Sequence, residues 1–170
     1  TVELLSSENL EFVGKEAFLN TDWYSSGADG VVYLGDIALG YKGLLTQGIN
    51  LVFRQGVKAI APYAFSRIEN IASVNIPQTV ITVHEGAFSE CRGIKTAVIS
   101  EGVAEIGDRA FENCSSLTNV SLPQSLQTLG PNVFYGCEQI AVISLYGDHT
   151  LGDLFGVGSF NGSYKATQMK

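Results

Sequence analysis

The side chains best suited to nucleophilic, redox or metal chemistry in this 170-residue sequence are three cysteines and two histidines. Cys91, Cys114 and Cys137 recur every 23 residues, whereas His84 and His149 do not share this register. A zinc site needs a tetrahedral cluster of ligands, and a Cys-His or Ser-His-Asp site needs a base positioned beside its nucleophile. The spacing indicates neither arrangement, so we expect no enzyme, no metal site and no cofactor.

Other groups that could carry chemistry are explained better as surface residues. Glu101 and Glu105 could be imagined as the carboxylate pair of a glycosidase, but solvated charges are the simpler interpretation. The Gly-Val-Gly run at residues 156–158 is too short for a phosphate-binding loop. Neither feature predicts catalysis.

The equal spacing of the three cysteines leaves two interpretations open. Stacked repeats would place successive cysteine Cα atoms about 5 Å apart, which lies within disulfide range. The side chains would run parallel, however, and three cysteines leave one over. We favour free, buried thiols that act as small apolar fillers.

The elements that must position these residues repeat with the same period. Phe65, Phe88, Phe111 and Phe134 follow one another at 23-residue intervals. Apolar residues also keep this register three, six, nine and eleven places after each Phe. One such unit cannot bury its apolar face alone, but stacked units form a continuous core.

Each unit contains three predicted segments. From Val120 the apolar residues alternate, as in a strand with one buried face, and Pro123 ends that strand. A second apolar pair, such as Val103 and Ile106, marks a short extended stretch. From Ile106 to Cys114 the apolar residues lie three to five apart, which suits a single helical turn. We therefore predict a right-handed α/β solenoid, rich in strands, with short helical turns.

The repeat resembles the BspA-like leucine-rich repeat of bacteria. The resemblance is carried by the run Ile-Gly-x-x-Ala-Phe-x-x-Cys-x-x-Leu-x-x-Val-x-Leu-Pro from Ile106 to Pro123, and it covers residues 49–146 well. Family members are typically exported surface proteins, and some are implicated in adhesion to host proteins or to other bacteria. The resemblance thus implies an extracellular or cell-surface leucine-rich repeat protein.

The repeat is interrupted between residues 21 and 45. Residues 31–34 and 37–41 could form a β-hairpin around a Gly-Asp turn. Alternatively, residues 34–39 copy residues 106–111 and form a degenerate repeat. We favour the hairpin.

We assign the whole chain, residues 1–170, to one leucine-rich repeat domain. Repeats are expected at residues 10–18 and 49–146, on either side of the insertion at residues 21–45. Residues 147–170 are expected to form a C-terminal cap, since terminal repeats are usually atypical.

The composition excludes two classes of partner. The net charge is −7, whereas nucleic-acid binding needs clustered Lys and Arg. No apolar run reaches the length of about 18 residues that a membrane span requires. We therefore expect no nucleic-acid partner and no membrane span in this chain.

Two surfaces escape the constraints of the repeat and are candidate binding sites. One is the outward face of the predicted strands, with small and mostly uncharged side chains: Ser73, Asn75, Thr96, Val98, Asn119, Ser121, Val142 and Ser144. The other is a group of aromatic residues in the interruption: Trp23, Tyr24, Tyr33 and Tyr41. These aromatic side chains could bind a partner, or they could cover an open core between mismatched repeats.

We expect a non-enzymatic module that binds a protein, such as a host or bacterial surface protein. The strand face lacks the Tyr, Trp and Arg that dominate interface energies, so binding should be weak per repeat and strengthened by many copies. A carbohydrate-binding or purely structural spacer domain is the alternative. Aromatic residues beside exposed carboxylates would favour sugar, and Ser, Thr and Asn on the strand face do not.

Overall fold

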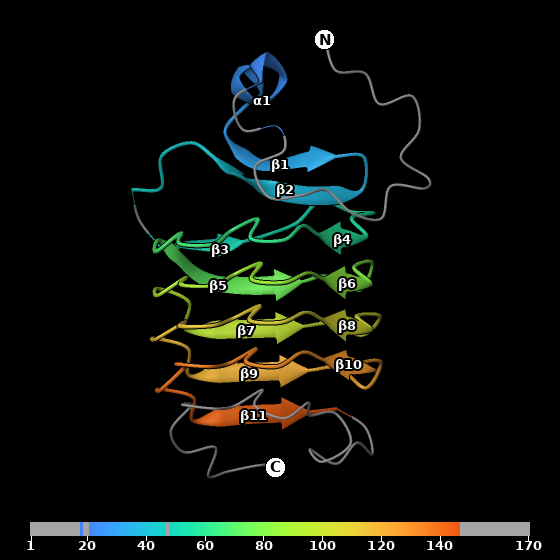
Figure 1. The fold of residues 1–170 in the computed structure, drawn as a ribbon, viewed down its shortest axis with the longest axis vertical. Helices are drawn as coiled ribbons and strands as arrows, with labels where there is room; N and C mark the ends of the chain where they lie inside the picture. Colours follow the sequence, from blue (N-terminus) through green and yellow to red (C-terminus); the bar gives the residue numbers. More distant parts are fainter. Residues whose placement is uncertain (1–17, 19–20, 47, 147–170) are drawn as a thin grey trace.

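The structure is a computed structural model that describes residues 18, 21–46 and 48–146. The chain winds into coils that stack along one long axis, with the N-terminal elements at one end and the last described strand at the other (Figure 1). Of the expected first repeat at residues 10–18, only Phe18 is among the described residues, and the expected cap at residues 147–170 lies outside them, as does His149.

Two sheets form the sides of the stack, and the repeated strands of each run parallel (Figure 1). The first has the strand order β11-β9-β7-β5-β3. Its strands are β3 (Ile49–Leu51), β5 (Ile71–Ile76), β7 (Thr96–Ile99), β9 (Asn119–Leu122) and β11 (Val142–Leu145). The second has the order β1-β2-β4-β6-β8-β10. Its short repeated strands are β4 (Ala59–Ile60), β6 (Thr82–Val83), β8 (Glu105–Ile106) and β10 (Thr128–Leu129).

Strand pairing keeps the coils in register, so equivalent residues form ladders through the core. Ala97 of β7 lies opposite Val120 of β9. The rings of the repeated phenylalanines stack at centroid distances of 5.4, 5.0 and 5.8 Å, with interplanar angles of 15° or less. All four of these phenylalanines are fully buried. The predicted period and its continuous core are confirmed.

The N-terminal interruption contains the predicted hairpin. A short helix, α1 (Asp22–Ser26), precedes β1 (Gly30–Leu34), which pairs antiparallel with β2 (Ile37–Lys42). The hairpin also extends the solenoid, because Ala38 of β2 pairs in parallel with Ile60 of β4. The insertion therefore adds two strands, β2 and β1, to the end of this sheet.

The alternative interpretation, a degenerate repeat at residues 34–39, aligns the interruption incorrectly with the later coils. It matched residue 34 with Ile106, whereas the sheet places Ala38 at the end of the column that runs through Ile60, Val83 and Ile106. The difference is four residues. A hairpin allows this four-residue offset, because its length is not tied to the 23-residue period of the coils.

The predicted short helical turns, and with them the α/β assignment, are wrong. Among the described residues only α1 is helical, and the segment around each Phe forms consecutive tight turns. The amide of Ser66 donates to the carbonyl of Tyr63 within the turn (3.1 Å), but that of Phe65 donates to Ala87 of the next coil (2.8 Å). A helix would use every amide within its own segment. In these turns every second amide donates to a carbonyl of the neighbouring coil. These bonds form a third ladder of backbone hydrogen bonds, beside those of the two sheets.

Two positions in every turn segment adopt left-handed backbone angles, which also prevents a helix. The first position holds Tyr63, Gly86, Arg109 and Asn132, and the second, four residues later, holds Arg67, Glu90, Asn113 and Gly136. Their φ angles lie between 53° and 71°. A residue with a Cβ pays roughly 1–2 kcal/mol in this region, so the repeat tolerates strain at most of these positions.

Replacing Arg109 by glycine is expected to raise the free energy of unfolding by about 0.5–1 kcal/mol, because relief of backbone strain exceeds the added entropy of the unfolded chain. The side chain is half exposed, and its contact with Glu112 at 3.8 Å contributes little. Urea denaturation measures the change. Arg92→Gly is the matched control: Arg92 is also exposed but has an ordinary φ, so this variant should lose stability. Equal losses in both variants would contradict the strain argument.

Candidate functional site

The sheet of β3, β5, β7, β9 and β11 presents the predicted strand face as one continuous surface, here called the ribbon. Strand pairing aligns its outward residues in two columns along the stack. One column contains Asn50, Ser73, Thr96, Asn119 and Val142, and the other contains Asn75, Val98, Ser121 and Ser144. The structure therefore brings together all eight strand-face residues that the sequence predicted.

The ribbon is flat, neutral and chemically mixed. No residue in its two columns is charged. Val98 and Val142 expose about two fifths of their surface, at 38% and 41%. The hydroxyl of Ser73 donates to the amide oxygen of Asn50 at 2.6 Å. Such a surface offers short hydrogen-bonding groups and small apolar spots, and it neither attracts nor repels a charged partner strongly.

The size of the ribbon limits how tightly one copy can bind. Five strands about 4.8 Å apart, each with about four residues at roughly 3.3 Å per residue, cover roughly 300 Å². A stable protein interface buries about 800 Å² on each partner. The described ribbon is therefore too small to hold a protein tightly by itself.

The aromatic residues of the interruption do not form one described patch. Tyr33 and Tyr41 are half buried and pack against the core. The guanidinium group of Arg54 lies 4.4 Å from the centre of the Tyr33 ring, and the Arg54 amide donates to the Tyr33 hydroxyl at 3.0 Å. Trp23 and Tyr24 belong to α1, and their side chains lie outside the described part of the chain. For Tyr33 and Tyr41, the structure favours a role in covering the core.

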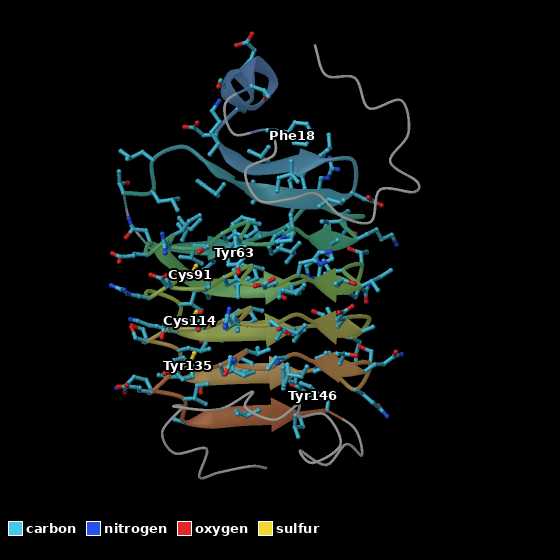
Figure 2. All side chains as sticks on the ribbon, in the orientation of Figure 1. Phe18, Tyr63, Cys91, Cys114, Tyr135 and Tyr146 are labelled. Atoms are coloured by element: carbon cyan, nitrogen blue, oxygen red, sulfur yellow. The ribbon has the colours of Figure 1, made fainter. Side chains whose placement is uncertain are left out.

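The three cysteines are free and fully buried, as the sequence predicted, and the labelled Cys91 and Cys114 lie on the same edge of the stack (Figure 2). Each thiol donates a hydrogen bond to a Phe carbonyl of the preceding coil: Cys91 to Phe65 (2.9 Å), Cys114 to Phe88 (3.2 Å) and Cys137 to Phe111 (3.0 Å). Burial raises the pKa of Cys91 to about 12. Burial, followed by the hydrogen bond with Cys137, raises that of Cys114 as well. The thiols of Cys91 and Cys114 therefore stay protonated near neutral pH and are not nucleophiles there.

The carboxylate Glu101 has a structural partner. Its two oxygens accept hydrogen bonds from the backbone amides of Gln124 (2.9 Å) and Ser125 (3.1 Å) in the next coil. A carboxylate held in this way joins the turns of two coils. This contact supports the interpretation that Glu101 is not half of a glycosidase pair.

Three acidic side chains and a tyrosine lie around His84. Glu85, Glu105, Asp108 and Tyr63 line a shallow hollow of about 480 Å³ with it. The Tyr63 hydroxyl donates to Glu85 at 2.5 Å, and this hydrogen bond is the main reason that the pKa of Tyr63 is raised. Within the described ranges, no group of three or more His, Cys, Asp or Glu side chains could hold a metal ion. The same part of the chain contains no helix long and apolar enough to cross a membrane.

Sequence reasoning missed a third group of residues at the edge of the stack. Tyr135, which is 45% exposed, lines a hollow of about 470 Å³. The same position in the preceding repeats holds Ser66, Ser89 and Glu112. A large aromatic residue in a slot that otherwise holds small or charged side chains was the available signal.

Comparisons with known proteins place the fold among bacterial leucine-rich repeats. A family model described as a BspA type leucine rich repeat region (6 copies) matches residues 45–165. The crystal structure of a leucine-rich repeat protein from Bacteroides capillosus ATCC 29799 is 23% identical, with a TM-score of 0.54, over 65% of this chain and 86% of that one. That likeness shows a shared fold.

Two further crystal structures have lower TM-scores. A leucine rich repeat protein from T. pallidum is 24% identical, with a TM-score of 0.46, over 69% of this chain and 68% of that one. A leucine rich cell surface protein from Faecalibacterium prausnitzii A2-165 is 19% identical, with a TM-score of 0.47, over 71% of this chain and 44% of that one. No curated protein matches the chain.

Proposed function

Because the chain belongs to the BspA-type leucine-rich repeat family, we propose that it is a non-enzymatic module that binds other proteins. Its site of action is the bacterial surface or the extracellular space, and its partners are surface proteins of a host or of other bacteria. Adhesion is the role that fits these partners. A leucine-rich repeat fold is consistent with protein binding, and the finer assignment rests on the properties of the ribbon.

The observation that carries the proposal is the alignment of uncharged, outward side chains across five strands. A folded core does not require these identities, because the outward positions do not pack inside the stack. Hydroxyl, amide and small apolar groups side by side suit a polypeptide surface, which offers the same mixture. The lack of charge favours partners that are not selected by long-range attraction.

The small area of the ribbon implies that binding depends on many copies. One copy contacts about 300 Å² of partner surface, which gives weak, reversible attachment. Linked copies convert later binding events into intramolecular ones and can raise the overall affinity by about 10²–10⁴-fold. A surface protein present in many copies meets this condition.

We predict that Asn119→Arg, at the centre of the ribbon, abolishes binding of the tetravalent chain to its protein partner. A long charged side chain on the flat surface would separate the two faces and leave a charge without a partner. The readout is biolayer interferometry with a streptavidin-linked tetramer against immobilised collagen, laminin and fibronectin. Binding by the wild-type tetramer should exceed that of the monomer by about 10²-fold or more.

Thr128→Arg is the matched control, because Thr128 is an exposed polar residue of β10 in the other sheet. This variant should bind like the wild type. Loss of binding in Thr128→Arg with retention in Asn119→Arg would contradict the proposal. Loss in Trp23→Ala and Tyr24→Ala, with retention in Asn119→Arg, would move the site to the interruption.

A further inference from the structure

The hollow beside Tyr135 lies at the edge of three successive coils, outside the ribbon. Figure 2 shows Tyr135 on the side of the stack where Cys91 and Cys114 lie, well away from Tyr146, which follows β11. The lining residues come from three repeats: Arg92, Asn113, Ser115, Tyr135, Gly136 and Glu138. Its volume of about 470 Å³ falls in the range of small-molecule sites, about 300–1,000 Å³.

The Tyr135 ring provides an aromatic wall that the fold does not need. The residue is 45% exposed, and the equivalent slots of the earlier repeats hold two serines and a glutamate. The backbone of Tyr135 still serves the ladder, since its carbonyl accepts from the Asn113 amide at 2.7 Å. The ring itself is therefore free to contact a ligand.

The polar groups around the ring are arranged along one column. Arg92, Ser115 and Glu138 occupy the same repeat position in successive coils, about 4.8 Å apart per coil. One positive and one negative group thus lie at the two ends of the column, with a hydroxyl between them. Within residues 48–146, Glu138 forms no ion pair, and Arg92 makes only exposed contacts at 3.7 and 3.8 Å. Both charged groups can reach a ligand.

Gly136 makes room for the side chain of Asn113, which also lines the hollow. A Cβ there would lie 2.2 Å from the side-chain oxygen of Asn113, and the φ of Gly136 is 71°. The Asn113 amide can therefore lie directly over the backbone of the next coil. A donor and an acceptor on a single short side chain are thereby held at the wall of the hollow.

We propose that this hollow binds a neutral saccharide unit. The C–H face of a sugar ring can stack on the electron-rich face of Tyr135. Its hydroxyls can bond to the guanidinium, amide, hydroxyl and carboxylate groups, which together offer donors and acceptors. Arg92 also contacts Glu69 and Glu90, so no unpaired positive charge selects an anionic sugar, and a neutral sugar can hydrogen-bond to both Arg92 and Glu138. This site and the ribbon do not share residues, so each can be tested without the other.

The test is a titration of the full chain with maltose, cellobiose, lactose and N,N′-diacetylchitobiose, followed by saturation-transfer NMR. At least one disaccharide should bind saturably. Tyr135→Ala should weaken that binding by about tenfold or more, and Tyr135→Phe, which keeps the aromatic face, should stay within about threefold of the wild type. Because Tyr135 is partly exposed, both variants should keep the thermal stability of the wild type.

Tyr146→Ala is the matched control, because Tyr146 is another exposed tyrosine, at 57%, on a different part of the stack. It should leave saccharide binding unchanged. The proposal is overturned if none of the four disaccharides binds, or if Tyr146→Ala weakens binding as much as Tyr135→Ala. It is also overturned if glucuronate or glucosamine binds more tightly than every neutral sugar.

Discussion

Replacing Phe111 by alanine is expected to lower the free energy of unfolding by about 3–5 kcal/mol. The Phe111 ring is fully buried between Phe88 and Phe134, at centroid distances of 5.0 and 5.8 Å. Its removal leaves a cavity and breaks the ladder on both sides. Since small domains unfold at a cost of about 5–15 kcal/mol, this one change removes a large part of the stability. Guanidinium denaturation followed by circular dichroism measures it.

The position of each Phe in the ladder should set the size of its effect. Among the rings of the described residues, that of Phe53 contacts Phe65 alone, edge to face at 5.6 Å and 84°, and it lies at the end of the series. Phe53→Ala should therefore cost clearly less than Phe111→Ala, because repeat stability depends on contacts with neighbours on both sides. Tyr146→Ala on the surface should change stability by no more than about 0.5 kcal/mol. Equal losses for Phe53→Ala and Phe111→Ala would contradict the ladder model.

The Cys91 thiol should react with iodoacetamide about 10³-fold more slowly in the native protein than in the unfolded protein at pH 8. An unfolded cysteine, with a pKa of about 8.5, is about one quarter thiolate at that pH. Burial raises the pKa of Cys91 to about 12, which leaves only about 10⁻⁴ as thiolate. The time course of labelling, read from the mass of the peptide that contains Cys91, measures the ratio. A mass two protons lower under non-reducing conditions would show a disulfide and contradict the free-thiol assignment.

Cys91 and Cys114 should make the fold sensitive to alkaline pH. Their pKa is higher in the folded state, so the folded chain holds protons that the unfolded chain releases above about pH 8.5. The free energy of unfolding should therefore be unaffected by the thiols below that pH. It should then fall as pH rises towards 12, by up to about 1.4 kcal/mol per pH unit for each of these two thiols. Urea denaturation between pH 7 and 11 follows this loss.

Cys91→Ala provides the control for the alkaline effect, because it removes one titrating thiol. Its stability should be lower at pH 7 but should decline less steeply with pH than that of the wild type. Identical slopes for the two proteins would show that Cys91 does not titrate as the structure implies.

Much of the fold could be predicted because the core repeats. A residue such as Phe111 packs against the equivalent residues of the neighbouring coils. These positions therefore hold similar residues, and the 23-residue period is visible in the sequence. The hairpin was also predictable from its turn residues. The helical turns were not distinguishable, because apolar spacing of three to five residues describes both a helix and a series of tight turns. The two differ only in the hydrogen-bond acceptors of their amides: the Phe65 amide, for example, donates to Ala87 of the next coil.

The candidate sites were less predictable, because a surface residue has no periodic partner. The columns of the ribbon follow from strand alternation, so the sequence placed them correctly on one face. Tyr135 was missed because its importance depends on Arg92 and Glu138, which lie in the same column only after the coils stack. The role of Glu101 was also hidden, because its amide partners belong to the next coil.

Our central claim is that the Phe and Cys ladders serve only packing and that the ribbon binds the protein partner. Photocrosslinking tests this most directly. Benzoylphenylalanine replaces Val142 at the edge of the ribbon in one tetravalent sample and Thr128 on the other sheet in a second. The account predicts covalent adducts with the bound matrix protein from position 142 and none from position 128. Adducts from position 128, with none from position 142, would contradict it.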